Sequence, residues 1–430
     1  MQAGPGFEPP PLHDVVPTRG LWRNSAFVRV WSAATISVFG SLVTRIALPF
    51  VAILVLHAGP IEMAALRSVD LVAALLVGCV AGAWVDRLRR RPVLIWADLG
   101  RAILLGSVPV AALGGWLTLA QLLVVTAAAA VLTTAFDVAD RAYLPTIVER
   151  DELVRANGAL AATNSGAEFA AFGVAGFLVQ AFTAPMAIAL DAVSFIVSAV
   201  ILGSIGRTEP APPPPAQREP ILDEIRVGIR LVAHDPVLRA LMAGSMALGA
   251  MWGVFGATWL LFITGDLGFD APTVGLVAAL GGLGSLIGAV GADRAVRRFG
   301  LGVVAVGALL AATVGNLLMG LAPVGAPLIA LACLIGQQLI GDGGVVVFEI
   351  TDASVRQVRV DGRQLGRVNA TVQVATVAAQ LVGTVGAGVL AVAIGLRGAI
   401  LFAPVAALIG VVLVWASPVR TMRSLEAVVD

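Results

Sequence analysis

Long apolar runs separated by short polar segments dominate the chain. A helix needs roughly 20 mostly apolar residues to cross about 30 Å of hydrocarbon at about 1.5 Å per residue. Such runs occur at 31–55, 63–85, 92–114, 117–139, 158–180, 186–206, 237–263, 273–292, 300–321, 327–349, 368–391 and 397–417. Several separating loops are very short and uncharged, which leaves ten or eleven spans as alternatives. The pattern predicts an all-α membrane protein of twelve transmembrane helices.

Arginines mark every second loop, and Arg397 is the exception. Positive charge in short loops resists translocation across the membrane. The clusters are Arg87, Arg89, Arg90 and Arg91; Arg141, Arg150 and Arg155; Arg207, Arg218, Arg226 and Arg230; Arg294, Arg297 and Arg298; and Arg356, Arg359 and Arg363. We therefore expect both termini on the cytoplasmic side of a bacterial inner membrane, with a disordered tail at 1–24 and a second tail at 418–430.

A proline-rich stretch divides the apolar runs into two sets of six. Residues 208–220 read TEPAPPPPAQREP, and proline removes a backbone donor and breaks helices. The expected organisation is one six-helix bundle at 25–206, a cytoplasmic linker at 207–236 and a second six-helix bundle at 237–417.

Composition narrows the function classes. The chain of 430 residues is 58% hydrophobic and 13% charged, with a mean hydropathy of +0.94, so the lipid bilayer is its solvent. A net charge of +1 indicates no nucleic-acid partner. All basic residues are arginine, which excludes the lysine of a phosphate-binding loop and makes ATP an unexpected partner. Two cysteines and three histidines, scattered along the chain, predict neither a metal site nor a cofactor.

One charged motif occurs once in each half. DRxxRR begins at Asp86 after the second run and again at Asp293 after the eighth. A shorter pair follows each copy: Arg155-Ala-Asn157 opens the fifth run, and Arg367-Val-Asn369 opens the eleventh. Two motifs in the same order in both halves indicate duplication of a six-helix unit.

With Gly82 in front, the first copy reads GxxxDRxxRR, the cytoplasmic signature of the major facilitator superfamily, and the chain resembles that family over nearly its whole length. Other stretches resemble the drug:proton antiporter branch with its macrolide-efflux and enterobactin-export proteins: Asp98-Leu-Gly-Arg101, Leu190-Asp191-Ala-Val-Ser194-Phe195 and Gly366-Arg367-Val-Asn369. Where that branch often has an acidic residue in span one, this chain has Gly40-Ser41.

The resemblance implies a secondary active transporter that exports small amphipathic or apolar molecules by proton antiport and alternating access, as a monomer. Small molecules, protons and the bilayer are then its partners. An importer or facilitator of a small nutrient on the same fold is the alternative. A non-transporting membrane scaffold is a further one. No nucleophile-and-base constellation indicates an enzyme.

The resemblance also implies a conformational latch at the cytoplasmic ends of the helices. Asp86 should close against the start of span eleven, near Arg367 and Asn369, while Asp293 does the same near Arg155 and Asn157. The latch residues are Gly82, Asp86, Arg87, Arg90, Asp293, Arg294, Arg298, Arg155, Asn157, Arg367 and Asn369. Static anchoring of the loops is the alternative.

Three ionisable residues inside the spans are proton-coupling candidates. A charge at mid-helix costs roughly 2.5 to 3.5 kcal/mol on insertion scales, so each requires a partner or a function. Arg45 and Glu168 lie near the middle of spans one and five, and Asp342 lies in Gly341-Asp342-Gly343-Gly344 of span ten. A fixed ion pair of Arg45 with Glu168, or a structural aspartate at 342, are the alternatives.

Other polar and aromatic residues complete the predicted set. Gln337 and Gln338 in span ten, and Trp252 and Trp259 in span seven, are substrate-cavity candidates, with ordinary packing as the alternative. Two further pairs are expected to be structural: Arg67 with Asp70, and Asp98 with Arg101, each three residues apart on a helix. Asp137 and Asp140 are expected to cap the inner end of span four, with proton carriers as the alternative.

Overall fold

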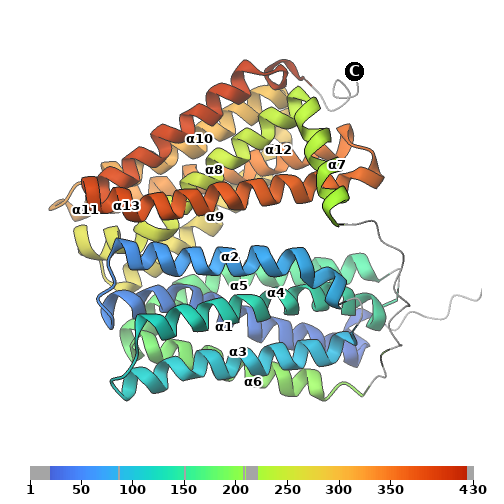
Figure 1. Cartoon of the computed structure of the whole chain (residues 1–430), viewed down its shortest axis with the longest axis vertical. Helices are drawn as coiled ribbons and strands as arrows, with labels where there is room; N and C mark the ends of the chain where they lie inside the picture. Colours follow the sequence, from blue (N-terminus) through green and yellow to red (C-terminus); the bar gives the residue numbers. More distant parts are fainter. Residues whose placement is uncertain (1–19, 86–87, 150–151, 207–208, 210–220, 424–430) are drawn as a thin grey trace, which may run out of the picture.

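The structure is a computed structural model that describes residues 20–85, 88–149, 152–206, 209 and 221–423, with no strand among them. Figure 1 shows two stacked helical halves, blue to green below and yellow to red above. The first half comprises α1 (Ser25–Leu54), α2 (Pro60–Val85), α3 (Arg90–Leu113), α4 (Leu119–Ile147), α5 (Leu153–Phe182) and α6 (Ala184–Gly203), preceded by a short turn of helix, η1 (Leu21–Arg23).

The second half begins after α7 (Ile221–His234). It comprises α8 (Pro236–Leu261) with the π-helical turn η2 (Phe262–Asp266), α9 (Ala271–Phe299), α10 (Leu301–Leu321), α11 (Pro327–Gly336), the π-helical turn η3 (Gln337–Asp342), α12 (Gly343–Arg359), α13 (Gly362–Ala416) and η4 (Pro418–Thr421). The turn η3 joins α11 to α12 in a single span.

Ten stretches of the described chain are long and apolar enough to cross a membrane. The longest one is two helices, because Gly395 in α13 adopts a φ of 80° and turns the chain back. The helix α2, at 26 residues, is also long enough. The described chain therefore folds into twelve membrane-spanning helices, which confirms the all-α fold predicted from the sequence.

Several helices extend beyond their apolar runs. The fourth run was expected to end at 139, but α4 continues to Ile147, and α12 continues to Arg359 rather than to 349. Asp137 and Asp140 therefore lie inside α4, and the prediction that they cap it is wrong. Hydropathy detects only the hydrocarbon-facing part of a helix, whereas backbone hydrogen bonding continues into the polar interface.

The loops fall on two faces. We call the face that carries Arg90, Arg294 and Arg356 the basic face. The face that carries the turns at His57, Thr183 and Gly395 is called the opposite face. The first and last described residues both lie at the basic face, where Asn24 donates to the carbonyl of Ile147 and Gly302 donates to the carbonyl of Met422. In Figure 1, α7 is at the basic face on the right and α11 starts on the left.

The predicted linker contains a helix that the sequence analysis did not anticipate. α7 packs along the start of α13, where Gly228 lies against the carbonyl oxygen of Arg367 and the side chain of Thr371. Its apolar residues Leu231 and Val232 join a small core with Val360 and Val368. The helix α7 is thus packed against the second half.

Equivalent tethers at the start of each half support the duplication. Asn24 caps α1 by accepting from Ala26 and Phe27, and its amide donates to the carbonyl of Ile147 at the end of α4. Asp235 caps α8, and its carboxylate accepts from Arg359 at the end of α12. In both halves the first helix is tied to the end of the fourth by its N-cap side chain.

The two halves meet closely toward the opposite face. Gly176 of α5 packs on the backbone of Ala271 and Gly275 at the start of α9, and Gly388 of α13 packs on Ala64 of α2. Small residues allow such close approach of membrane helices. One buried core runs through both halves here, whereas Phe27, Phe136 and Tyr143 form a separate core at the basic end of the first half.

Candidate transport pathway between the two halves

Two carboxylates, one from each half, lie near the middle of the bundle. Glu168 is on α5 and Asp342 ends η3; at about 1.5 Å per residue, both lie roughly 21 to 22 Å from the opposite-face ends of their spans. The two side chains are within Coulombic range of each other. Among the described residues neither has a hydrogen-bond or ion-pair partner, and Oδ1 of Asp342 is buried and unsatisfied.

The π-helical turn η3 positions Asp342 and two amides. Gln337 donates to Oδ1 of Asn316 at 3.1 Å, and Gln338 donates to the carbonyl of Val277 at 3.0 Å. The side chains of Gln337 and Gln338 are 3% and 7% exposed. Both of their hydrogen-bond acceptors belong to the second half. Gly281 of α9 leaves room for the carboxylate of Asp342. Because π-helical turns frequently occur at functional sites, η3 is a candidate centre of the pathway.

Two arginines lie nearer the opposite face. The guanidinium of Arg45 stands over the ring of Phe172, 5.9 Å from its centroid, one helical turn beyond Glu168 on α5. Arg45 is also within Coulombic range of Arg67, which forms the expected ion pair with Asp70 at 2.5 Å. Within the described ranges no ion pair joins Arg45 to Glu168, so that alternative of the sequence analysis is not realised.

The tryptophans of α8 flank a contact between the halves. Gly256 lies against the side chain of Arg67 from α2. Trp252 and Trp259 are four residues before and three after Gly256, so all three share one face of the helix. Both tryptophans are half-buried and pack against the main core.

The latch residues of the second half are engaged locally in this conformation. Asp293 forms an ion pair with Arg297 on its own helix, with both side chains largely exposed, and Arg294 is exposed beside it. Arg298 stacks near Phe299. Asn369 accepts from Arg356 at 2.7 Å. Asp293 therefore does not reach Arg155 or Asn157 here.

The latch residues of the first half are described in part. Asp86 and Arg87 lie outside the described residues, and Gly82 lies in α2. Arg155 is exposed, and Asn157 donates to the carbonyl of Leu153 on its own helix. Arg367 lies under α7, at the contact with Gly228.

Glu209 is a partner of the signature that the sequence analysis missed. Its carboxylate accepts from the backbone N–H groups of Arg90 and Arg91 at 2.8 and 3.1 Å and also pairs with the Arg90 guanidinium at 3.4 Å. Arg91 donates to the carbonyl of Leu202 at the end of α6. A carboxylate at a helix N-terminus is favourable, so Glu209 ties the start of α3 to the chain leaving α6. The acidic residue at position 209, in the proline-rich stretch 208–220, was the one sequence feature that could have indicated this contact.

A buried charge cluster inside the first half was only partly anticipated. Asp98 and Arg101 form the expected ion pair at 2.5 Å, fully enclosed, and the guanidinium lies between the rings of Phe136 and Phe195 at 4.5 and 4.2 Å. The bundle-packing role predicted for this pair fits that burial.

Asp191 lies in the same half, within the stretch Leu190-Asp191-Ala-Val-Ser194-Phe195, and the sequence predicted no specific role for it. Its carboxylate accepts hydrogen bonds from Thr44 of α1 and from Ser194. Gly40 faces this carboxylate, and any side chain there would collide with Asp191 and Ser194. The glycine at position 40 thus makes room for the carboxylate of Asp191 on α6.

The second half carries a polar network at its basic end. Asp352 pairs with Arg356 at 3.0 Å and accepts from Ser245 of α8 at 3.2 Å, while Arg356 also donates to Asn369. The network joins α8, α12 and α13. Its aspartate and arginine are four apart, as are Asp137 and Arg141 in the equivalent span of the first half. The repeated spacing of aspartate and arginine could have predicted an ion pair at this level in each half.

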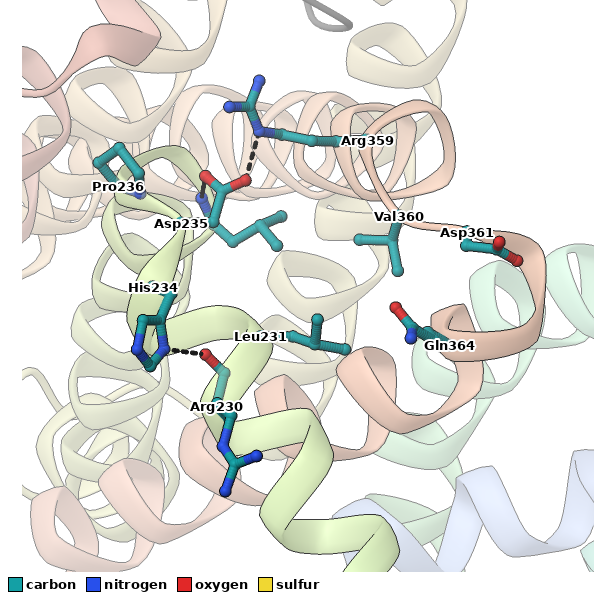
Figure 2. A pocket seen from close by; sticks show the side chains of 10 residues that line it. Arg230, Leu231, His234, Asp235, Pro236, Arg359, Val360, Asp361 and Gln364 are labelled. Carbon is teal, nitrogen blue, oxygen red and sulfur yellow. Dashed lines mark hydrogen bonds and ion pairs between the residues drawn. The ribbon is translucent and has the colours of Figure 1, made fainter.

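A cavity of about 500 Å³ opens at the basic face beside α7 (Figure 2). Arg230 and His234 of α7 line one side, and Val360 and Gln364 line the other. The Asp235–Arg359 ion pair closes one end. The cavity lies within the second half and its linker helix, away from Glu168.

Two six-helix bundles with charged side chains between them define a polytopic membrane transporter. The sequence profile of the Major Facilitator Superfamily matches residues 30–351, and the chain belongs to this family. It is similar to the "Uncharacterized MFS-type transporter YfiS" of Bacillus subtilis (strain 168), with 24% identity over 396 residues, covering 89% of this chain and 90% of that protein.

Solved structures share the fold at low sequence identity. A mutant form of the nucleoside transporter NupG superposes with a TM-score of 0.75 at 12% identity, covering 91% of this chain and 99% of that one. A bacterial homologue of the iron transporter ferroportin gives 0.70 at 17% identity in its inward-facing state and 0.57 at 19% in its outward-facing state, each covering 91% of this chain and 98% of that one.

Proposed function

We propose that this protein is a proton-coupled exporter of small amphipathic or apolar molecules, working as a monomer by alternating access in a bacterial inner membrane. In this proposal the basic face is cytoplasmic, because arginine-rich loops resist translocation. Both bundles come from one chain, so a single copy supplies both sides of the pathway. Lysine is absent from the sequence, which supports a gradient rather than ATP as the energy source.

The conformation supports an opening toward the basic face. The tight contacts between the halves, at Gly176 with Gly275 and at Gly388 with Ala64, lie toward the opposite face. The better superposition on the inward-facing ferroportin homologue than on its outward-facing state agrees with this assignment. The protein is thus poised to take substrate from the side that we assign to the cytoplasm.

Glu168 and Asp342, which lie within Coulombic range of each other, carry the proposal of proton coupling. Glu168 and Asp342 belong to different halves and repel each other when both are ionised. A proton bound by either one removes the repulsion and lets the halves approach at this level. Proton binding and release would then favour different relative positions of the halves, which is what coupling requires.

The latch residues fit the same cycle. In the present conformation Asp293 pairs with Arg297 and Asn369 with Arg356, so neither group is used between the halves. When the basic face closes, we propose that Asp293 engages Arg155 and Asn157, and that Asp86 engages the start of α13 near Asn369. Each contact would stabilise the state that opens to the opposite face.

Efflux into everted membrane vesicles tests the proposal. A panel of labelled amphipathic compounds is offered with and without a proton uncoupler, for the wild type and for Glu168→Gln and Asp342→Asn. We expect concentrative uptake that the uncoupler abolishes and that both variants lose. Asp266→Asn, an exposed carboxylate at the opposite face, should behave as the wild type. Uptake that survives uncoupling while ATP is present contradicts the coupling, and accumulation only in right-side-out vesicles indicates an importer.

A further inference from the structure

The charged residues between the halves form two layers of opposite sign. Arg45 and Arg67 lie roughly 14 and 10 Å from the opposite-face ends of their helices, at about 1.5 Å per residue. Glu168 and Asp342 lie roughly 7 to 12 Å deeper on the same scale. Phe172, one turn from Glu168, stands under Arg45 and so lies at the boundary between the layers.

The two layers are not paired with each other. The guanidinium of Arg45 stands over the ring of Phe172, and no ion pair joins it to Glu168 in the ranges that the structure describes. Glu168 and Asp342 likewise have no cationic partner among those residues. Arg45 is within Coulombic range of a second arginine, Arg67, whose own charge is paired with Asp70, and Glu168 is within Coulombic range of Asp342. Arg45 and the two carboxylates are therefore the charges of these layers without an ion-pair partner among the described residues.

Such an arrangement is costly unless something neutralises it. Arg45 and Glu168 are exposed in this conformation and so are accessible to a ligand, and the like charges of Glu168 and Asp342 repel each other when both are ionised. A bound molecule that carries an anionic and a cationic group would satisfy both layers at once. Its apolar body would lie against Phe172, and aromatic rings accept such contacts readily.

We propose that the substrate is an amphipathic zwitterion, with its anionic group held by Arg45 and its cationic group held between Glu168 and Asp342. This inference rests on the proposed function, because it assigns the substrate class of the same pathway. It also gives the coupling a direct form: a proton on Glu168 or Asp342 weakens the hold on the cationic group. Proton and substrate then compete for the same carboxylates, as antiport requires.

Binding to the purified full chain tests the charge preference without any gradient. Three probes share one ring system: 3-(2-naphthyl)alanine is zwitterionic, 2-(2-naphthyl)ethylamine is cationic and 3-(2-naphthyl)propanoate is anionic. Affinity is measured near pH 7.5 by equilibrium dialysis in detergent. We expect the zwitterion to bind about tenfold or more tightly than either singly charged probe, since each loses one charged contact.

Variants assign each charge to its layer. Arg45→Gln should bring the zwitterion down to the affinity of the amine, whereas Arg45→Lys, which keeps the charge, should retain most of the preference. Glu168→Gln should bring the zwitterion down toward the propanoate. Arg239→Gln, an exposed arginine at the basic face, is the matched control and should change nothing. Size-exclusion chromatography and the melting temperature without ligand confirm that each variant is folded.

The outcomes separate this inference from the proposed function. Equal affinity for the three probes, no binding of the zwitterion, or a preference that survives both Arg45→Gln and Glu168→Gln overturns the zwitterion assignment. Proton-driven efflux of singly charged compounds, without that preference, would leave the proposed function standing alone. A zwitterion preference without proton-driven transport would instead support the assignment and contradict the coupling.

Discussion

A single methyl group at position 176 should open the opposite face. A Cβ added to Gly176 would fall well inside 3.0 Å of the carbonyl oxygen of Ala271, and 3.1 Å from Cα of Gly275, whereas ordinary contact begins at 3.4 Å. The neighbours are backbone atoms of α9, so they cannot turn aside. Overpacking of this kind costs roughly 1 to 3 kcal/mol. Only the conformation in which α5 and α9 touch bears that cost.

The expected consequence is a population shift. A difference of about 1 to 3 kcal/mol changes a two-state equilibrium by about 5- to 150-fold, so Gly176→Ala should move the protein toward the state that opens to the opposite face. Gly173→Ala is the matched control, since a Cβ there meets nothing within 4 Å, on the same helix.

Distances between spin labels measure the shift. Leu113 and Leu328 lie at the opposite face in different halves, 80% and 81% exposed, and are suitable labelling sites once Cys79 and Cys333 are replaced by serine. We expect a longer distance to gain population in Gly176→Ala and the wild-type distribution in Gly173→Ala. Unchanged distances in Gly176→Ala, or an equal change in both variants, would refute the assignment of this contact to a closed gate.

Three further predictions concern charge. Asp98→Asn should destabilise the protein by about 3 to 5 kcal/mol, because it leaves Arg101 buried without its carboxylate partner. Asp70→Asn, which breaks a half-exposed ion pair, should cost about 1 kcal/mol or less. Thermal unfolding in detergent measures the stability of both variants. Asp270 caps α9, and its hydrogen bonds with Thr273 hold the pKa of its carboxyl below the usual value. Asp270→Ala should therefore cost about 1 kcal/mol above pH 4, an effect that fades as the pH falls through the lowered pKa, and melting curves across pH 2 to 7 test this. Asp86→Asn should favour the state that opens to the basic face by about 0.5 to 2 kcal/mol, and Asp293→Asn should do so more weakly. Distances between spin labels at the basic end of α2 and at the start of α13 measure the shift. Unchanged distance distributions would mean that the motif only sets the topology of the chain.

The sequence predicted the features that depend on local composition. Runs of apolar residues located the spans, since the hydrocarbon admits little else. The DRxxRR pairs predicted the duplication that the tethers at Asn24 and Asp235 support. Ion pairs three residues apart, such as Asp98 with Arg101, followed from helix geometry alone.

The features that the sequence could not predict depend on which helices become neighbours. Glu168 was expected near Arg45 because both lie near mid-span, but the packing places Asp342 within its range instead. Asp191 had no visible partner until α1 brought Thr44 to it. The π-helical geometry of η3 is likewise set by packing, because no local sequence rule distinguishes it from the α-helix on either side.

The duplication explains the scaffold of the protein but not the chemistry that we propose for it. Aligning Asn157 with Asn369 places Gln380 at the position equivalent to Glu168, since each lies eleven residues further along its chain. Aligning Asp137 with Asp352 in the same way places Ala127 opposite Asp342. Neither Gln380 nor Ala127 can titrate, so the two carboxylates are not related by the repeat. The tethers, the latch motifs and the Asp-x-x-x-Arg spacing recur because each half must fold and close in the same way. Glu168 and Asp342 have no counterparts in the repeat, and each half supplies one of them. Because they belong to different halves, their mutual repulsion depends on how one half is positioned relative to the other.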